Sequence, residues 1–295
     1  MNKHIHTAYP ATVAPTFNLV IVHGMQEHAG RYHEFATFLS EHGGNVITFD
    51  LPGHGAFGHN AEQLGNFGEE GLPHVFAQIA AYFDYWDNGL PNVLFGHSMG
   101  SAIALRYAQL HHNVHHLILS GVPYRSARFF NLAYHTAVIE KRVKGANKES
   151  MLCRQTAKFN DFFAPNRTPY DWLSLNTDNV DRYIADPHCG YPISISYFEE
   201  MLNLMRMAFE PQELLKMGTT LPILLLWGEQ DPCTNFGKSS YRLTNFLRQH
   251  WQAEVNTIQY PKLRHEILHE HQRGEVFQDV LASIAAVIHA PTEQP

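Results

Sequence analysis

The sequence has no long hydrophobic run and few cysteines. Its longest apolar stretch, 221–227, is far too short to cross a bilayer, and the first six residues lack the apolar core of a signal peptide. The cysteines at Cys153, Cys189 and Cys233 are odd in number and scattered, which predicts neither a disulfide framework nor a zinc site. These absences favour a cytoplasmic protein.

Basic residues are also fewer than acidic ones. The chain carries 28 acidic and 21 basic residues, a net charge of −7, and no long basic run, so we expect no nucleic-acid partner. Histidine, by contrast, is abundant, with 21 residues. We expect most of them to decorate the surface, as at His111, His112, His115 and His116.

The 295 residues, 44% of them hydrophobic, supply a large core. Apolar runs predict strands at 17–22, 45–49, 92–95, 116–120, 221–227 and 254–260, and amphipathic patterns predict helices at 32–42, 72–86, 101–110 and 274–289. The alternation stops between about 124 and 216. We therefore expect an α/β core formed by 1–123 and 217–295, with a mostly parallel sheet covered by helices on both faces, and a helical cap at 124–216.

A serine stands at the tip of a predicted strand–turn–helix. The segment Gly96-His97-Ser98-Met99-Gly100 follows an apolar strand and precedes an alanine-rich helix, which is the context of a G-x-S-x-G nucleophile elbow. Its sharp turn leaves no room for side chains at the flanking glycines, and the helix N-terminus offers N–H groups to a developing oxyanion. Ser98 is the candidate nucleophile.

A serine nucleophile needs a base and an acid that orients the base. Asp231 follows the next-to-last predicted strand, and His265 follows the last one, 34 residues later, which leaves room for a helix and a strand. We predict Asp231 as the acid and His265 as the general base. Glu229 and Glu213 are weaker candidates for the acid.

The same stretch contains a zinc-protease pattern. Residues 265–269 read H-E-x-x-H, which binds metal only within a helix, where both histidines face one ion. Here His265 follows directly on a strand and loop. We therefore predict no metal and no cofactor, and we expect His269 on a helix surface.

The oxyanion needs a second N–H besides that of Met99. The loop at 23–28 follows the first long strand and contains a glycine that lets the backbone come close, so the Met25 N–H is the expected second donor. Three polar side chains are expected to brace this loop from beneath: Glu27, His28 and Arg31.

Together these motifs resemble one family. The ordered series is His23-Gly24-x-x-Glu27-His28-x-x-Arg31-Tyr32, Asp50-x-x-Gly53-His54-Gly55, Gly96-His97-Ser98-Met99-Gly100, Gly228-x-x-Asp231 and His265-Glu266-x-Leu268. It looks like the monoacylglycerol lipase and lysophospholipase branch of the α/β-hydrolase superfamily, also labelled serine aminopeptidase-like. The resemblance implies the α/β-hydrolase fold with a cap after the sixth standard strand. It also implies Ser98, Asp231 and His265 as the triad and Met25 and Met99 as oxyanion donors.

Two departures from that family are visible. Only about sixteen residues precede the first long strand, where relatives carry a β-hairpin, so we expect a shortened or irregular sheet edge. Met25 and Gln26 replace the smaller residues common in that loop, and the bulk of Met25 is expected to narrow the acyl entrance.

The predicted activity is hydrolysis of carboxylic esters, with single-acyl-chain lipid esters as substrates. The cap is rich in aromatic residues and methionine, which suits an acyl chain. The partner is then a small-molecule acyl ester, with transient membrane-surface contact, if any, through the cap. A serine aminopeptidase, an acyltransferase, and a ligand-binding receptor or scaffold with little turnover remain alternatives.

Overall fold

The computed structural model describes residues 6–57, 63–68 and 71–288. These residues form a seven-stranded sheet in the order β1-β3-β2-β4-β5-β6-β7. The strands are β1 His6–Tyr9, β2 Phe17–Val22, β3 Gly44–Phe49, β4 Asn92–His97, β5 His116–Ser120, β6 Ile223–Gly228 and β7 Val255–Tyr260. All neighbouring strands are parallel except β1, which runs antiparallel to β3. This mostly parallel sheet confirms the predicted fold class.

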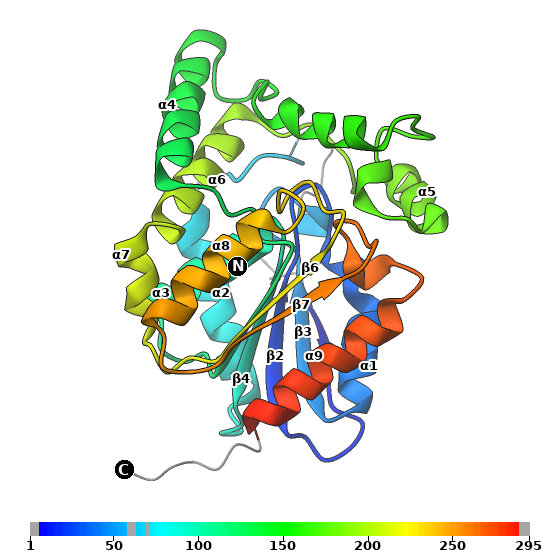
Figure 1. Cartoon of the computed structure of the whole chain (residues 1–295), viewed down its shortest axis with the longest axis vertical. Helices are drawn as coiled ribbons and strands as arrows, with labels where there is room; N and C mark the ends of the chain where they lie inside the picture. Colours follow the sequence, from blue (N-terminus) through cyan, green and yellow to red (C-terminus); the bar gives the residue numbers. More distant parts are fainter. Residues whose placement is uncertain (1–5, 58–62, 69–70, 289–295) are drawn as a thin grey trace.

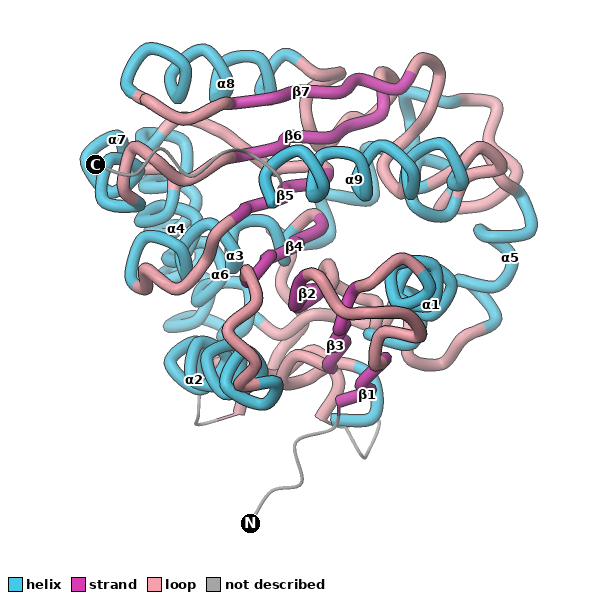
Figure 2. Tube along the Cα trace, turned by 90° about the horizontal axis from the view of Figure 1, so that it is seen from below, coloured by secondary structure: helices cyan, strands magenta, loops and turns pink. Residues whose placement is uncertain are grey.

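Helices cover both faces of the sheet (Figure 2). On one face lie α1 (His33–Glu41) and α9 (Arg273–Ile288), and on the other lie α2 (Gly71–Trp86), α3 (Met99–Leu110) and α8 (Lys238–His250). The central strands are continuous apolar runs with both faces buried, as a parallel sheet between two helical layers requires. Each predicted strand and helix of the core is present within a few residues of its expected bounds; His289, the expected end of the last helix, lies outside the described residues.

The outer edge of the sheet is short. Within the described residues a single four-residue strand, β1, stands before β2, and it pairs along β3 from Tyr9 with Val46 to His6 with Phe49. This agrees with the expectation of a shortened edge where relatives carry a hairpin.

The segment between β5 and β6 lies over the carboxyl ends of the strands (Figure 1). Its helices are α4 (Ala127–Lys144), α5 (Thr177–Ala185), α6 (Ile195–Ala208) and α7 (Pro211–Leu214), joined by 3₁₀ turns. Helix α6 packs against both α4 and the core helix α3. None of the helices in the described ranges is long and apolar enough to cross a membrane.

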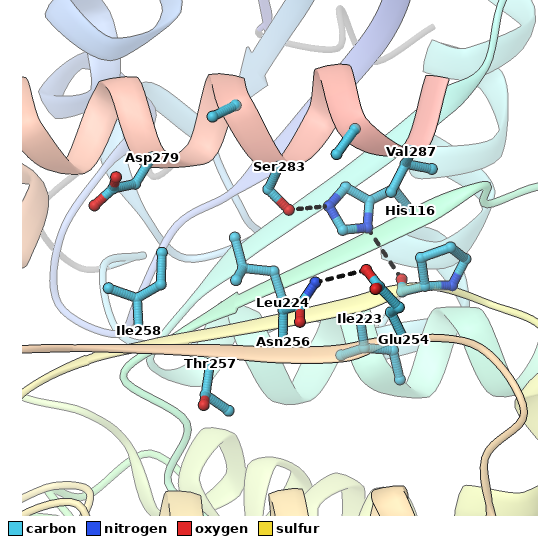
Figure 3. A pocket seen from close by; sticks show the side chains of 13 residues that line it. His116, Ile223, Leu224, Glu254, Asn256, Thr257, Ile258, Asp279, Ser283 and Val287 are labelled. Atoms are coloured by element: carbon cyan, nitrogen blue, oxygen red, sulfur yellow. Dashed lines mark hydrogen bonds between the residues drawn. The ribbon is translucent and has the colours of Figure 1, made fainter. Parts of the chain in front are cut away.

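His116, expected on the surface, is instead buried at the start of β5. Its Nδ1 lies 3.1 Å from the Pro222 carbonyl oxygen and its Nε2 lies 3.0 Å from Ser283 Oγ, so both ring nitrogens are satisfied inside the protein. Burial lowers the pKa of His116 to about 4. The ring lines a pocket of about 350 Å³ between α9 and the first residues of β5 to β7, at the end of the sheet opposite the cap (Figure 3).

Candidate active site

Ser98 occupies a strained turn between β4 and α3. Its backbone has φ 52° and ψ −120°, a conformation rarely adopted by a residue with a side chain. A Cβ atom at Gly96 would lie 2.4 Å from the Gly100 carbonyl oxygen, and one at Gly100 would lie 2.1 Å from the Val22 carbonyl oxygen. Only glycine fits at either position, so the G-x-S-x-G pattern is a steric requirement of this turn, and it leaves the serine half-buried.

Ser98, His265 and Asp231 form one hydrogen-bonded line. Ser98 Oγ lies 2.9 Å from His265 Nε2, and His265 Nδ1 lies 2.9 Å from Asp231 Oδ2. The other carboxylate oxygen of Asp231 accepts a 2.8 Å bond from the Cys233 N–H, which fixes the acid in its loop after β6. With a proton on Nδ1, the imidazole donates to Asp231 and can accept the proton of the serine hydroxyl, which is the arrangement that nucleophilic catalysis by serine needs.

The two weaker acid candidates lie elsewhere. Glu229 accepts a 2.9 Å bond from the Lys262 N–H, and Glu213 forms an ion pair with Arg106 at 2.5 Å. Of the carboxylates considered from the sequence, only Asp231 contacts the His265 ring in the described structure.

The surroundings of His265 favour its charged form. Burial alone would lower the pKa of His265, but the charge and hydrogen bond of Asp231, together with the charges of Glu266 and Glu27, outweigh burial and raise the pKa above its ordinary value. The neighbouring His97 ring, whose centroid is 4.8 Å away, is kept neutral because burial, and then the charge of His265, lower its pKa to about 3. Trp172 of the cap stacks on the His265 ring, with ring centroids 5.1 Å apart.

The loop after β2 passes directly over Ser98. A Cβ atom at Gly24 would lie 3.2 Å from Ser98 Cβ, and the Gly24 N–H donates a 2.5 Å bond to Glu27 Oε1. The next residue, Met25, directs its N–H to no described acceptor, and Met99 is the first residue of α3, where the helix leaves N–H groups unpaired. These are the two N–H groups expected from the sequence at the oxyanion position.

Contacts from the rest of the chain hold this loop in an unusual conformation. Gln26 has a positive φ of 61°, and its N–H donates a 3.2 Å bond to His54 Nε2. Its carbonyl oxygen accepts bonds from the Tyr183 hydroxyl at 2.9 Å and the Gly190 N–H at 3.0 Å. The His54 of the D-x-x-G-H-G motif and two residues of the cap thus position the loop. The sequence marked the motif but gave no sign of these partners.

A buried ion-pair network lies under the loop. Arg31 donates bonds of 2.6 Å to both oxygens of Glu266 and one of 2.7 Å to Glu27. Burial would raise the pKa of the Glu266 carboxyl, but the Arg31 guanidinium holds it well below its usual range. Because Glu266 follows His265 and Glu27 binds Gly24, Arg31 connects the loop of the base to the loop over the serine. Of the three residues expected to brace this loop, Glu27 and Arg31 lie in the network, whereas His28 bonds to Asp186; Glu266 was not expected there.

His269 does not lie on a helix surface as expected. It ends a 3₁₀ helix, Ile267–His269, and is half-buried with its ring edge-on to Tyr32, 5.7 Å between centroids. Burial, and then the charge of Arg31, lower the pKa of His269 to about 3. Both ring nitrogens of His265 are engaged by Ser98 and Asp231, so the H-E-x-x-H histidines have different surroundings and no shared helix face.

Two groups of side chains in the described residues have metal-ligand spacing: His28, Asp186 and Cys189, and Asp231, Cys233 and His265. In the first group, His28 Nδ1 accepts a 3.2 Å bond from the Gly30 N–H, so the ring proton is on Nε2, where it donates to Asp186 at 2.9 Å. That nitrogen has no free electron pair for a metal. The second group includes the acid and the histidine that line up with Ser98. His28 therefore supports the loop through the cap.

Comparison with known proteins identifies the family of the chain. The family model described as serine aminopeptidase, S33 matches residues 14–272. Monoglyceride lipase of Homo sapiens is 27% identical over 88% of this chain and 78% of that protein. Monoacylglycerol lipase of Mycolicibacterium smegmatis is 25% identical over 96% of this chain and 92% of that protein, and phospholipase YtpA of Bacillus subtilis is 26% identical over 90% and 93%.

Among solved structures, a thermostable carboxyl esterase from Bacillus coagulans superposes with a TM-score of 0.85 at 27% identity. The match covers 97% of this chain and 95% of that one. The chain therefore belongs to the serine aminopeptidase S33 family and is a serine hydrolase with the α/β-hydrolase fold.

Proposed function

We propose that the protein hydrolyses single-acyl-chain lipid esters of the monoacylglycerol or lysophospholipid type. Ser98 is the nucleophile, His265 the general base and Asp231 the acid that orients it, while the Met25 and Met99 N–H groups form the oxyanion hole. The observation that carries this proposal is the line of two 2.9 Å hydrogen bonds from Ser98 through His265 to Asp231.

In the proposed mechanism, His265 Nε2 takes the Ser98 proton as Oγ attacks the ester carbonyl carbon. The two N–H groups bind the oxyanion of the tetrahedral intermediate, and Asp231 stabilises the imidazolium. The C–O bond to the alcohol then breaks, and the alcohol leaves with the proton from His265. Water repeats the sequence on the acyl-enzyme, which releases the fatty acid and restores Ser98.

The substrate class is inferred from the relatives and the cap. The relatives above are named monoglyceride lipases and a phospholipase. We take residues 124–216 as the cap; Trp172 stacks on His265, and the Tyr197 hydroxyl lies 3.3 Å from the sulfur of Met99, so aromatic side chains of this segment border the serine. Met25 is half-buried against the core cluster that contains Tyr197 and Met99, which supports a limit on chain length at the acyl entrance.

We also propose that α4 brings the protein to lipid surfaces. Four large apolar side chains along this helix are 52–77% exposed: Phe129, Leu132, Ile139 and Val143. Their spacing of three, seven and four residues places them on one side of the helix. Three basic residues lie in the last turn. Lys141 and Lys144 pair with Glu199 and Glu140, which leaves the charge of Arg142 for an interface with anionic lipid. Figure 1 shows α4 at the outer side of the cap.

A single set of experiments tests the activity. A fluorophosphonate probe should label wild-type protein, and Ser98→Ala should lose both labelling and turnover of monoacylglycerols by several orders of magnitude. An alanine variant that kept more than about a tenth of the wild-type rate would exclude Ser98 as nucleophile.

Monoacylglycerols from acetyl to oleoyl should show specificity constants that rise to medium chains, since each buried methylene adds about 0.8 kcal/mol at most. Faster cleavage of aminoacyl amides than of any ester would instead make the protein an aminopeptidase.

A further inference from the structure

A second, smaller pocket lies beside the triad, where the chain leaves β5 for the cap. It has a volume of about 260 Å³ and is lined by Tyr124, Arg125, Ser126, Phe129, Asn235, Ser239 and Arg242. It is smaller than typical pockets for whole ligands, which run from about 300 to 1,000 Å³, so it suits a small polar group better than an acyl chain. The lining contains two arginines and no carboxylate, in a protein whose net charge is −7.

The charge of Arg125 has no acidic partner. Its Nη1 donates to the Tyr124 carbonyl oxygen at 2.8 Å, to the Cys233 carbonyl oxygen at 3.0 Å and to Ser239 Oγ at 2.9 Å. All three acceptors are neutral, and its remaining N–H groups bond to no residue of the described chain. These bonds fix the position of the Arg125 guanidinium and leave some of its N–H groups available to a ligand.

Arg242 lines the same pocket from an exposed position on α8 and has even fewer contacts. It follows Ser239 by three residues on α8, so the two share one face of the helix and Arg125, bound to Ser239, comes close to it. Within the described ranges, Arg242 forms no hydrogen bond or ion pair; its charge acts on the neighbouring Tyr124. Two like charges brought together without a carboxylate are stabilised by an anion bound between them.

The pocket and the triad share a wall. Arg125 binds the Cys233 carbonyl oxygen, while the Cys233 sulfur lies within 4.8 Å of the nearest ligand atoms of Asp231 and His265. A group bound at the arginines is therefore separated from the reacting atoms by a single residue.

From this arrangement we propose that the pocket between Arg125 and Arg242 binds a phosphate group, and that this group is the headgroup phosphate of a single-chain ester substrate. A carboxylate has two oxygens, which one guanidinium can satisfy, whereas a phosphate presents more oxygens and can bind two guanidiniums at once. The assignment of the headgroup rests on the proposed function. It narrows the substrate class to lysophospholipids.

The test compares two esters that differ only in the phosphate: 1-lauroylglycerol and 1-lauroylglycerol 3-phosphate, both below their micelle concentrations. We expect Arg242→Gln to lower the ratio of kcat/KM for the phosphate ester over that for the neutral ester by about tenfold or more, since it removes charged hydrogen bonds to the phosphate. Arg182→Gln is the matched control, because it removes the same charge from an exposed position on α5, away from both the pocket and α4. It should leave the ratio within about twofold.

Calorimetric titration with glycerol 3-phosphate and with inorganic phosphate separates the two sources of the anion. If glycerol 3-phosphate binds wild-type protein but not Arg242→Gln, and the kcat/KM ratio also falls, the pocket binds the headgroup phosphate of the substrate. Inorganic phosphate that binds in wild type and not in Arg242→Gln, with an unchanged ratio, supports a phosphate site and overturns the headgroup role. An unchanged ratio with no phosphate binding overturns the whole proposal. If wild-type protein turns over neither ester, the proposed function fails, and the titrations alone decide the phosphate site.

Discussion

Replacing Arg31 tests whether the buried brace positions both loops of the active site. The guanidinium is 9% exposed and neutralises two carboxylates that are 3% exposed, those of Glu27 and Glu266. Arg31→Gln leaves both carboxylates buried without a counter-charge. Breaking a buried ion pair by removing one partner costs about 3–5 kcal/mol, and for a protein of this size that corresponds to a fall in Tm of roughly 6–20 °C.

The matched control is Arg167→Gln, which removes the same group from an exposed pair with Asp181. The two side chains are 45% and 57% exposed, and their hydrogen bond is 2.6 Å long. An exposed pair contributes about 0–1 kcal/mol, so this variant should unfold within a few degrees of wild type. Thermal unfolding of the three proteins at pH 8 gives the comparison.

The pH dependence separates the loss of a charge from a loss of packing. In wild-type protein the pKa of Glu266 is depressed, so its contribution to stability is present above the unfolded value near 4.5 and is lost as the pH falls. In Arg31→Gln the burial that remains favours the protonated carboxyl, which can take up a proton as the pH falls. The stability deficit of the variant should therefore be larger at pH 8 than at pH 5. A deficit below about 1 kcal/mol, or one that does not change with pH, would refute the role of Arg31 as a counter-charge.

Three further outcomes are expected. Because Asp231 raises the pKa of His265, kcat/KM for a soluble short ester should fall on the acid side with a midpoint above 6.5, and a midpoint below that value contradicts the assignment. Burial lowers the pKa of His97 to about 3 and that of His116 to about 4, so the unfolded chain binds more protons below pH 6.5. Urea unfolding should show stability falling between pH 7 and 5, by up to about 2 kcal/mol for each ring, and His116→Gln should reduce that slope. Leu132→Asp should slow hydrolysis of substrate in vesicles but not of a soluble short ester; equal loss on both would exclude α4 as the lipid contact.

The core of the fold could be predicted because its signals are local. Strands β2 to β6 are buried on both faces, so each appears in the sequence as a short apolar run ended by glycine, proline or polar residues. The carboxyl ends of these strands meet at one edge of the sheet, which is why Ser98, Asp231 and His265 could be placed together from positions far apart in the chain. The structure brings the three within hydrogen-bond distance, and their catalytic roles stay predictions.

Two histidines whose positions were predicted wrongly show what a local sequence pattern cannot reveal. His116 is expected on the surface because histidine is polar and common in this chain, and His269 is expected on a helix surface because the H-E-x-x-H stretch is not predicted to bind metal. His116 is buried where α9 supplies the Ser283 hydroxyl to its ring, and His269 is half-buried with its ring edge-on to Tyr32. Both partners come from distant parts of the chain, so no local window reveals them. The positive φ of Gln26 is likewise set by distant contacts, those of His54 and the cap.

The H-E-x-x-H stretch shows that the spacing of two residues can be interpreted only when the backbone conformation between them is known. In an α-helix, residues four apart share a face, but here His265 lies in the loop after β7 and the following residues form a 3₁₀ helix, where residues three apart are aligned instead. The backbone therefore gives adjacent residues separate partners: His265 faces Ser98 and Asp231, while Glu266 turns to Arg31. Because those two residues are consecutive, the ion pair that holds Glu266 also fixes the position from which His265 reaches the serine. A change at Arg31 is therefore expected to alter turnover as well as stability, even though Arg31 contacts no member of the triad.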